Sequence, residues 1–277
     1  MVAMAAIVKS PVAMAAMWRS DTAIKALQAN ATAWKTFTGA SSAVMGKTVA
    51  ILANLDPSGY ADMTAIAASQ VAMAAVASSQ VAMAAVASSQ VAMTAIIANA
   101  TALNAVVTSQ VAMAAIQKSQ TALSAIAASS MATAKYAAGA AGLNPADYAD
   151  MTAIASSQVA MAAVAASNTA TKAIAASQTA LNAIAGSTTA LDALYAKKSR
   201  LTGASASKSG KFIILQISND SAFDTSRYGY ATLSDGSQPN WQDYKSKYAY
   251  FKQFKKIATY IKNDTEGDDW IDYFPCG

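Results

Sequence analysis

The 277-residue sequence has no histidine, one cysteine (Cys276) and only 13% charged residues. Without histidine, the usual zinc sites and the nucleophile–histidine pairs of hydrolases cannot form, and one cysteine excludes an intrachain disulfide framework. We expect Cys276 to be a free thiol, with a contact between chains as the alternative. These absences favour a protein that is not an enzyme and that carries no cofactor or metal.

Large side chains are also scarce, since only 8% of the residues are aromatic although 54% are apolar. Much of the apolar content is alanine, which gains little free energy from burial and is the best helix former. A single chain with so few large side chains would bury only a thin core. We therefore expect a mainly α protein whose helices pack closely against copies of themselves.

Long hydrophobic runs are absent, because polar pairs such as Ser-Gln interrupt the sequence about every ten residues. No stretch reaches the length of about 18 apolar residues that a membrane helix needs, so we expect no membrane insertion. The N-terminus has no basic region before its apolar residues, so we expect no signal peptide. The net charge of +5 comes with mixed charges concentrated after Tyr195, typical of a solvated domain and not of a nucleic-acid-binding stripe.

Ten-residue repeats fill most of the chain. The repeat that begins at Ser69 reads Ser-Gln-Val-Ala-Met-Ala-Ala-Val-Ala-Ser and recurs, with substitutions, every ten residues up to position 119. A second run follows Asp147, and a more divergent one begins at Ser10. A fixed period of this kind indicates a repeat architecture.

A longer duplication lies on top of the repeats. Residues 55–66 match residues 143–154, and each copy carries a proline, Pro57 or Pro145, that cannot sit inside an unbroken helix. We therefore divide the chain into N-terminal helical repeats (1–54), a first repeat segment (55–142), a second repeat segment (143–202) and a C-terminal head (203–277).

The period of ten suggests how the apolar residues are buried. At about 100° per residue, ten residues fall about 80° short of three helical turns, so an apolar stripe would spiral around a straight helix. Wrapping several helices around one another would bury it, and we expect an elongated, parallel, trimeric coiled-coil rod. Its seam would comprise Ser69, Ala72, Met73 and Val76, and residues 61–196 would span about 200 Å.

Two other folds fit parts of the pattern. In the first, the serine of each repeat caps a short helix, and the helices form a bundle within one chain. In the second, the repeats form a β-solenoid, which the poor strand propensity of alanine disfavours. The recurring glutamines (Gln70, Gln80, Gln90, Gln110, Gln120, Gln158 and Gln178) either flank the seam or form rings on a threefold axis that hold water or ions.

The residue composition changes in the C-terminal head, where the ten-residue repeats end. Residues 203–210 have the composition of a flexible linker, residues 211–217 and 228–233 have the pattern of strands, and residues 234–237 that of a turn. Residues 244–261 fit a helix or a strand. The acidic residues 264–269 suggest either a solvated loop or a calcium site. Exposed aromatic and basic residues would suit a surface polysaccharide, and the candidates are Trp241, Tyr244, Tyr250, Lys252 and Trp270; alternatively, these rings form the small core.

The repeats, together with the Asp-Pro-Ser-Gly-Tyr-Ala-Asp-Met-Thr-Ala-Ile-Ala sequence that begins at Asp56, resemble the repeat regions of tailed-bacteriophage fibre and virion structural proteins. The resemblance covers residues 1–200. It implies a homotrimer on the surface of a phage particle, made in the host cytoplasm, as a tail fibre or a collar (neck) fibre.

We therefore expect a structural virion protein whose rod gives reach and whose head contacts the host surface or locks the trimer. Its partners would be other virion proteins of the tail, collar or baseplate, and a polysaccharide or protein of the host cell surface. Trp18, Trp34 and Phe37 are the candidates for docking on the virion. The alternative is a bacterial surface adhesin with a helical stalk. A depolymerase is disfavoured, because few residues follow Gly210.

Overall fold

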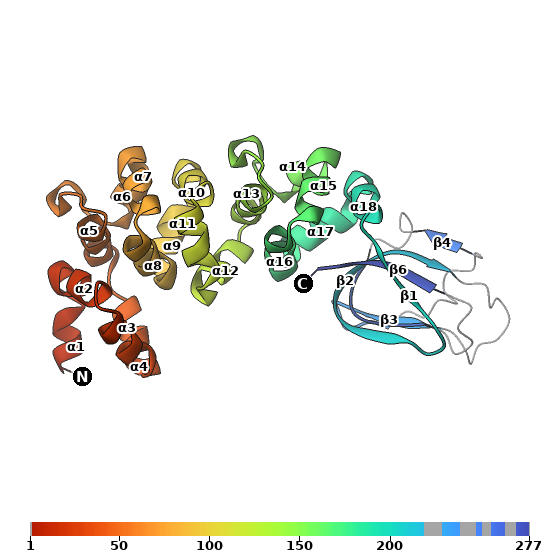
Figure 1. Cartoon of the computed structure of the whole chain (residues 1–277), viewed down its shortest axis with the longest axis horizontal. Helices are drawn as coiled ribbons and strands as arrows, with labels where there is room; N and C mark the ends of the chain where they lie inside the picture. Colours follow the sequence, from red (N-terminus) through yellow and green to blue (C-terminus); the bar gives the residue numbers. More distant parts are fainter. Residues whose placement is uncertain (1, 219–228, 239–247, 251–255, 264–269, 277) are drawn as a thin grey trace. The chain divides into compact units, whose positions relative to one another are not determined.

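In the computed structural model, the chain is mainly helical (64%), with a small antiparallel sheet at its C-terminal end (Figure 1). The structure describes residues 2–218, 229–238, 248–250, 256–263 and 270–276. The chain forms two compact units, Met1–Gly139 with Asn144–Asp147 and Ala140–Leu143 with Tyr148–Gly277. The expectation of a mainly α chain with a β-containing C-terminal part is confirmed.

The helical part consists of many short helices in place of a few long ones. In chain order, the α-helices are α1 (Val2–Ile7), α2 (Pro11–Trp18), α3 (Asp21–Gln28), α4 (Ala31–Thr38), α5 (Ser42–Leu52), α6 (Met63–Ala68), α7 (Gln70–Ser78), α8 (Gln80–Ser88), α9 (Gln90–Ile97), α10 (Ala100–Val107), α11 (Gln110–Gln117), α12 (Gln120–Ala127), α13 (Ser130–Ala140), α14 (Met151–Ala155), α15 (Gln158–Ala166), α16 (Asn168–Ala176), α17 (Gln178–Gly186) and α18 (Thr188–Tyr195). Two 3₁₀ turns, η1 (Pro57–Gly59) and η2 (Pro145–Asp147), lie at the duplicated segments.

Each repeat forms one short helix because a polar residue caps its start. Ser69 has extended backbone angles (φ −96°, ψ 112°), and its hydroxyl accepts a hydrogen bond from the Ala72 N–H at 3.2 Å. Asn30 and Asn99 take the same role in α4 and α10. Serine and asparagine are preferred at this position because they satisfy a backbone donor that has no intrahelical partner. The chain turns sharply at these caps, by 102° between α7 and α8.

These breaks correct the expectation of a coiled-coil rod, because its long continuous helices are replaced in the described repeats by single-repeat helices. The extended cap residue changes the direction of the chain every ten residues. Each helix is therefore too short for its apolar stripe to wind around the helix axis. The alternative of short, serine-capped helices within one chain describes the observed fold.

Within each unit, a helix packs side by side with the helix three positions further along the chain. In the first unit α7 packs against α10, α8 against α11 and α9 against α12, and in the second unit α14 packs against α17 and α15 against α18. Three repeats therefore make one turn, and we call this arrangement the solenoid. Neighbouring helices pack about 8–10 Å apart, so thirty residues advance the solenoid by about 10 Å, against about 45 Å for a continuous helix.

The core of the solenoid comes from the same positions in each repeat. Ala72, Met73 and Val76 are buried, whereas Gln70 and Ala74 on the same helix are exposed. The alanine lets helices approach closely while the larger pair fills the space between turns. The residues predicted to form a seam between chains thus lie in the interior of one chain, and Ser69 lies at its corner.

The serine hydroxyls also connect successive turns. The Ser187 hydroxyl donates a hydrogen bond to the carbonyl of Ala155 at 2.6 Å, across 32 residues of sequence. Ser109 and Ser119 make the equivalent bonds to Ala77 and Ala87. Each of these carbonyls lies at or next to the last residue of a helix, 32 residues earlier, where carbonyls have no intrahelical donor.

The duplicated segments form two similar joints, as the prolines predict. In each joint a 3₁₀ turn precedes an aspartate that caps the next helix: Asp62 accepts from the Ala65 N–H at 2.9 Å and Asp150 from the Ala153 N–H at 3.0 Å. At the second joint the buried Lys135 donates from Nζ to the Pro145 carbonyl at 3.0 Å, and burial lowers the pKa of its amine.

The C-terminal sheet belongs to the second unit and is antiparallel throughout its described part. Its strands are β1 (Ser199–Thr202), β2 (Ser207–Ser218), β3 (Tyr230–Leu233), β4 (Tyr248–Tyr250), β5 (Lys256–Lys262) and β6 (Trp270–Pro275). Their order is β1-β6-β2-β5-β3, and β4 pairs with β2. The helices α17 and α18 contact β5 and β6.

The strands predicted over 211–217 and 228–233 correspond to β2 and β3, and Ser234–Ser237 forms the predicted turn, with the Gly236 N–H donating to the Leu233 carbonyl at 3.0 Å. Residues 203–206 are not a linker but the tight connection between β1 and β2. Gly203 adopts φ 99° there, and its carbonyl accepts from the Asn263 side chain at 3.2 Å.

Candidate functional site

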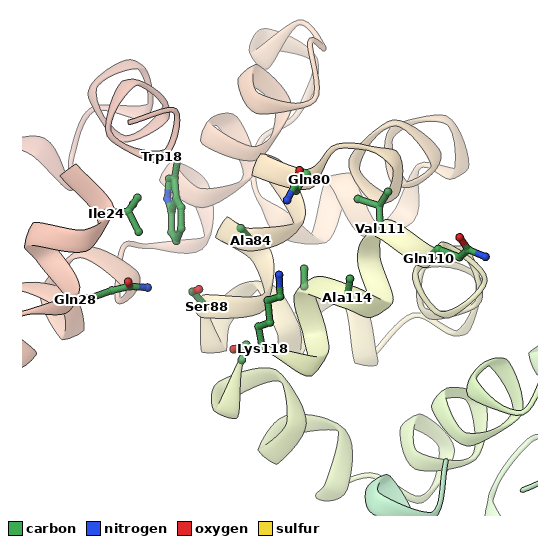
Figure 2. Close-up of a pocket in the computed structure, with 12 residues that line it drawn as sticks. Trp18, Ile24, Gln28, Gln80, Ala84, Ser88, Gln110, Val111, Ala114 and Lys118 are labelled. Carbon is green, nitrogen blue, oxygen red and sulfur yellow. The ribbon is translucent and has the colours of Figure 1, made fainter. Parts of the chain in front are cut away.

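A groove of about 530 Å³ lies in the first unit (Figure 2). Its floor comes from the outer faces of α8 and α11, which lie side by side. On α8 the lining residues Gln80, Ala84 and Ser88 are spaced four apart and so share one helix face. On α11 Gln110 and Ala114 have the same spacing. The repeat itself therefore builds the groove.

The side chains that line the groove are uncharged with one exception. Lys118 is the only ionisable side chain among its described lining residues, and its amino group points into the groove (Figure 2). Ser119 also lines the groove, but its hydroxyl already accepts from the Ala122 N–H at 3.2 Å and donates to the Ala87 carbonyl. A nucleophilic serine needs a hydroxyl that is free to meet a base, and the Ser119 hydroxyl is held by both of these hydrogen bonds.

The three residues predicted to dock on the virion form one aromatic cluster. The ring centroids of Trp18 and Phe37 lie 5.3 Å apart, and those of Trp18 and Trp34 lie 5.8 Å apart in an edge-to-face arrangement. Trp18 is 5% exposed and Phe37 is fully buried, whereas Trp34 is half-buried. The cluster therefore stabilises the N-terminal repeats, and only Trp34 offers surface to a partner.

One polar atom in this cluster has no hydrogen-bond partner. The indole nitrogen of Trp18 is buried and unpaired, although the edge of its ring lines the groove (Figure 2). An unpaired buried donor costs about 1–3 kcal/mol. No solvent reaches this nitrogen, so it is not available to a ligand in the groove without movement of the ring.

The recurring glutamines of the repeats lie on the outside of each unit. All seven of these glutamines begin a helix and are exposed: Gln70, Gln80, Gln90, Gln110, Gln120, Gln158 and Gln178. The Gln178 side chain donates to the Asn182 side chain at 3.0 Å. Contacts of this kind, four residues apart, support isolated helices. The glutamines keep the helix starts solvated, and the idea of rings on a threefold axis stays a prediction.

The candidate contacts in the head are only partly described. Trp241, Tyr244 and Lys252 lie outside the described residues, as do the acidic residues 264–269. Tyr250 ends β4, where its backbone pairs with Gln216. Trp270 begins β6, and the guanidinium of Arg200 lies 3.7 Å from the centre of its ring, a cation–π arrangement.

An ion pair between a buried aspartate and an exposed arginine lies beside Trp270 and was not predicted from the sequence. Asp272 is fully buried and accepts two hydrogen bonds from Arg200, at 2.6 Å and 2.8 Å. The pKa of Arg200 is raised, chiefly by its hydrogen bond to Asp272. The Tyr195 hydroxyl donates to Gln216 Oε1 at 2.7 Å and thereby connects the end of α18 to β2. This cluster fixes the last helix on the sheet.

Cys276 is a free thiol and is buried, 2% exposed. Burial raises the pKa of this thiol to about 12. A thiol in this state is a poor nucleophile and cannot reach a cysteine of another chain without local opening.

Among the described residues, no group of three or more His, Cys, Asp or Glu side chains is placed to hold a metal ion. In the same part of the chain, no single helix is long and apolar enough to cross a membrane, although two sharply bent helix pairs reach that length together.

Comparison of the sequence with protein-family models and with curated proteins gives no match.

Proposed function

We propose that the chain is a non-enzymatic structural protein of a bacteriophage particle, a component of a tail or collar fibre. The observation that carries the proposal is the solenoid with its two joints. Each repeat contacts repeats near it in sequence, so the number of repeats sets the length of a segment without changing its surface chemistry. A spacer needs this property, and the repeat sequences resemble those of phage fibre proteins.

The solenoid changes the part that the chain plays in a fibre. Because thirty residues advance it by about 10 Å, the repeat segments are short, broad spacers and not the long thin shaft expected from the sequence. We propose that each repeat segment is a spacer, that the N-terminal region, which includes Trp34, binds the virion, and that the sheet near the C-terminus contacts the host surface or a neighbouring chain.

The homotrimer remains part of the proposal, but for a different reason. The apolar residues of the ten-residue repeats are buried within one chain, so their burial does not require three chains. Fibres on a phage particle are nevertheless symmetric assemblies, and chains of one kind commonly associate around a closed axis. Mass measurement in solution distinguishes one chain of 28.3 kDa from three.

The proposal is tested on purified phage particles. We expect mass spectrometry to detect this chain in particles purified through a density gradient, and immunogold labelling to place it on the tail or the collar. If the protein is absent from particles and labels the envelope of uninfected cells instead, the chain is a bacterial surface adhesin and the proposal is wrong.

A further inference from the structure

One face of the C-terminal sheet carries two tyrosines side by side. The ring centroids of Tyr230 on β3 and Tyr260 on β5 lie 5.7 Å apart, with their planes inclined by 36°. Both side chains are half-buried. The buried ring pair Phe212–Tyr273, in contrast, belongs to the hydrophobic core of the sheet. The tyrosine pair therefore leaves ring surface open to a ligand.

The strand register places these rings on the face opposite that core. Their sequence neighbours Ala231 and Ile261 belong to the core cluster and pair with each other across β3 and β5. Because successive side chains on a strand point to opposite faces, Tyr230 and Tyr260 point away from the core.

The same register assembles a patch of six side chains in two rows. One row runs across three strands as Ser209, Tyr260 and Thr232, and the next as Ser207, Lys262 and Tyr230. With strands about 4.8 Å apart, the patch is about 10 Å wide. The two rings lie diagonally across it, within the reach that aromatic side chains have on adjacent strands.

Neutral hydrogen-bonding groups surround the two rings. Ser207 and Ser209 are exposed, and the Gln238 amide donates to the Thr232 hydroxyl at 3.0 Å, which holds the amide beside the patch. Lys262 is the only ionisable group in the two rows apart from the tyrosine hydroxyls. The patch thus combines apolar ring faces with hydroxyl and amide groups and little charge.

We propose that this tyrosine patch binds a neutral polysaccharide. A pyranose ring has a face of C–H groups that packs on an aromatic ring and an edge of hydroxyls that exchange hydrogen bonds with amides and hydroxyls. Tyrosine suits this use because it offers a rigid apolar body with a polar tip. The inference rests on the proposed function only in that the polysaccharide would belong to the host surface.

The test is affinity electrophoresis of the full-length chain in gels that contain dextran, mannan or galactan. We expect slower migration in at least one of these gels. Tyr230→Ala and Tyr260→Ala should each weaken binding at least tenfold, and Thr232→Val, which keeps the shape of the side chain, should weaken it several-fold. Tyr60→Ala is the matched control, because Tyr60 is a half-buried tyrosine in the first unit.

Three outcomes overturn the inference: unchanged migration of the wild-type chain in all three gels, equal weakening by Tyr60→Ala, or binding only to polygalacturonate that Lys262→Gln abolishes. The last would mean that the patch recognises an acidic polymer by charge. If the protein is present on particles but binds no neutral polysaccharide, this inference fails and the proposed function stands. If the protein binds a neutral polysaccharide but is absent from particles, the proposed function fails and this inference stands.

Discussion

At the scale of single residues, a serine hydroxyl at a corner of the solenoid makes two hydrogen bonds. The Ser79 hydroxyl accepts from the Ala82 N–H at 3.3 Å and donates to the Leu52 carbonyl at 3.1 Å, 27 residues earlier. Ser167 bonds to Ala140 in the same way at 2.8 Å, 88 residues further along the chain. One hydroxyl therefore starts a helix and attaches it to another, which explains why serine recurs with the period of the repeat.

Replacing this hydroxyl should destabilise the solenoid. We predict that Ser79→Ala lowers the free energy of unfolding by about 1–2 kcal/mol, because it removes a helix cap and a bond between turns. Ser78→Ala is the control, because the exposed Ser78 bonds only to carbonyls of its own helix and should change stability by less than about 0.5 kcal/mol. Urea denaturation followed by circular dichroism measures both, and equal losses would contradict the role assigned to Ser79.

The state of Cys276 gives a second prediction at this scale. A buried thiol with a pKa of about 12 has almost no thiolate at pH 8, so it should not react with a disulfide reagent in the folded protein. We expect no release of thionitrobenzoate over an hour in buffer and one equivalent per chain in guanidinium chloride. Rapid reaction of the folded chain would show that Cys276 is accessible to another chain.

At the scale of elements, glycine allows two helices to approach closely at the first joint. A Cβ atom added to Gly46 in α5 would lie 2.3 Å from the Asp62 backbone, which is too close for any side chain. In contrast, nothing lies within 4 Å of a Cβ atom added to Gly186, the last residue of α17.

We predict opposite effects for alanine at these two glycines. Gly46→Ala should lower the thermal midpoint of unfolding, because the backbone at the joint must move to accept a methyl group. Gly186→Ala should leave it unchanged or raise it, since alanine favours a helix by up to about 1 kcal/mol over glycine. Differential scanning calorimetry gives both midpoints, and a neutral Gly46→Ala would show that α5 and α6 are not closely packed.

The elements also show what the sequence could and could not predict. The short joints, the strands β2 and β3 and the buried Ala72, Met73 and Val76 follow from local patterns of proline, β-branched residues and period. The pairing of Arg200 with Asp272 could not be predicted, because it joins strands 72 residues apart that are adjacent only in the folded sheet. The sequence also gave no signal for the tyrosine patch, which depends on strand register.

At the scale of the whole molecule, the difference between expectation and structure comes from one assumption. A coiled coil requires each helix to run straight across several repeats, and in such a helix the apolar stripe would spiral. An extended residue at every cap removes that condition and lets each unit bury its own alanine-rich core. Pro11 already indicates such a break in the sequence. It follows Ser10 at the start of a repeat, and a proline there would break a helix that continued from the repeat before.

Proline substitution in α7 tests this account most directly, because Gln70 holds the first helical position and Ala74 the middle of the same helix, both exposed. The first position of a helix accepts proline, as Pro11 does in α2, and the extended Ser69 before it is compatible with proline. We therefore predict that Gln70→Pro changes the free energy of unfolding by less than about 1 kcal/mol, whereas Ala74→Pro costs about 3 kcal/mol or more. If Gln70→Pro proves as damaging as Ala74→Pro, the helix runs unbroken through Ser69 and the solenoid is wrong.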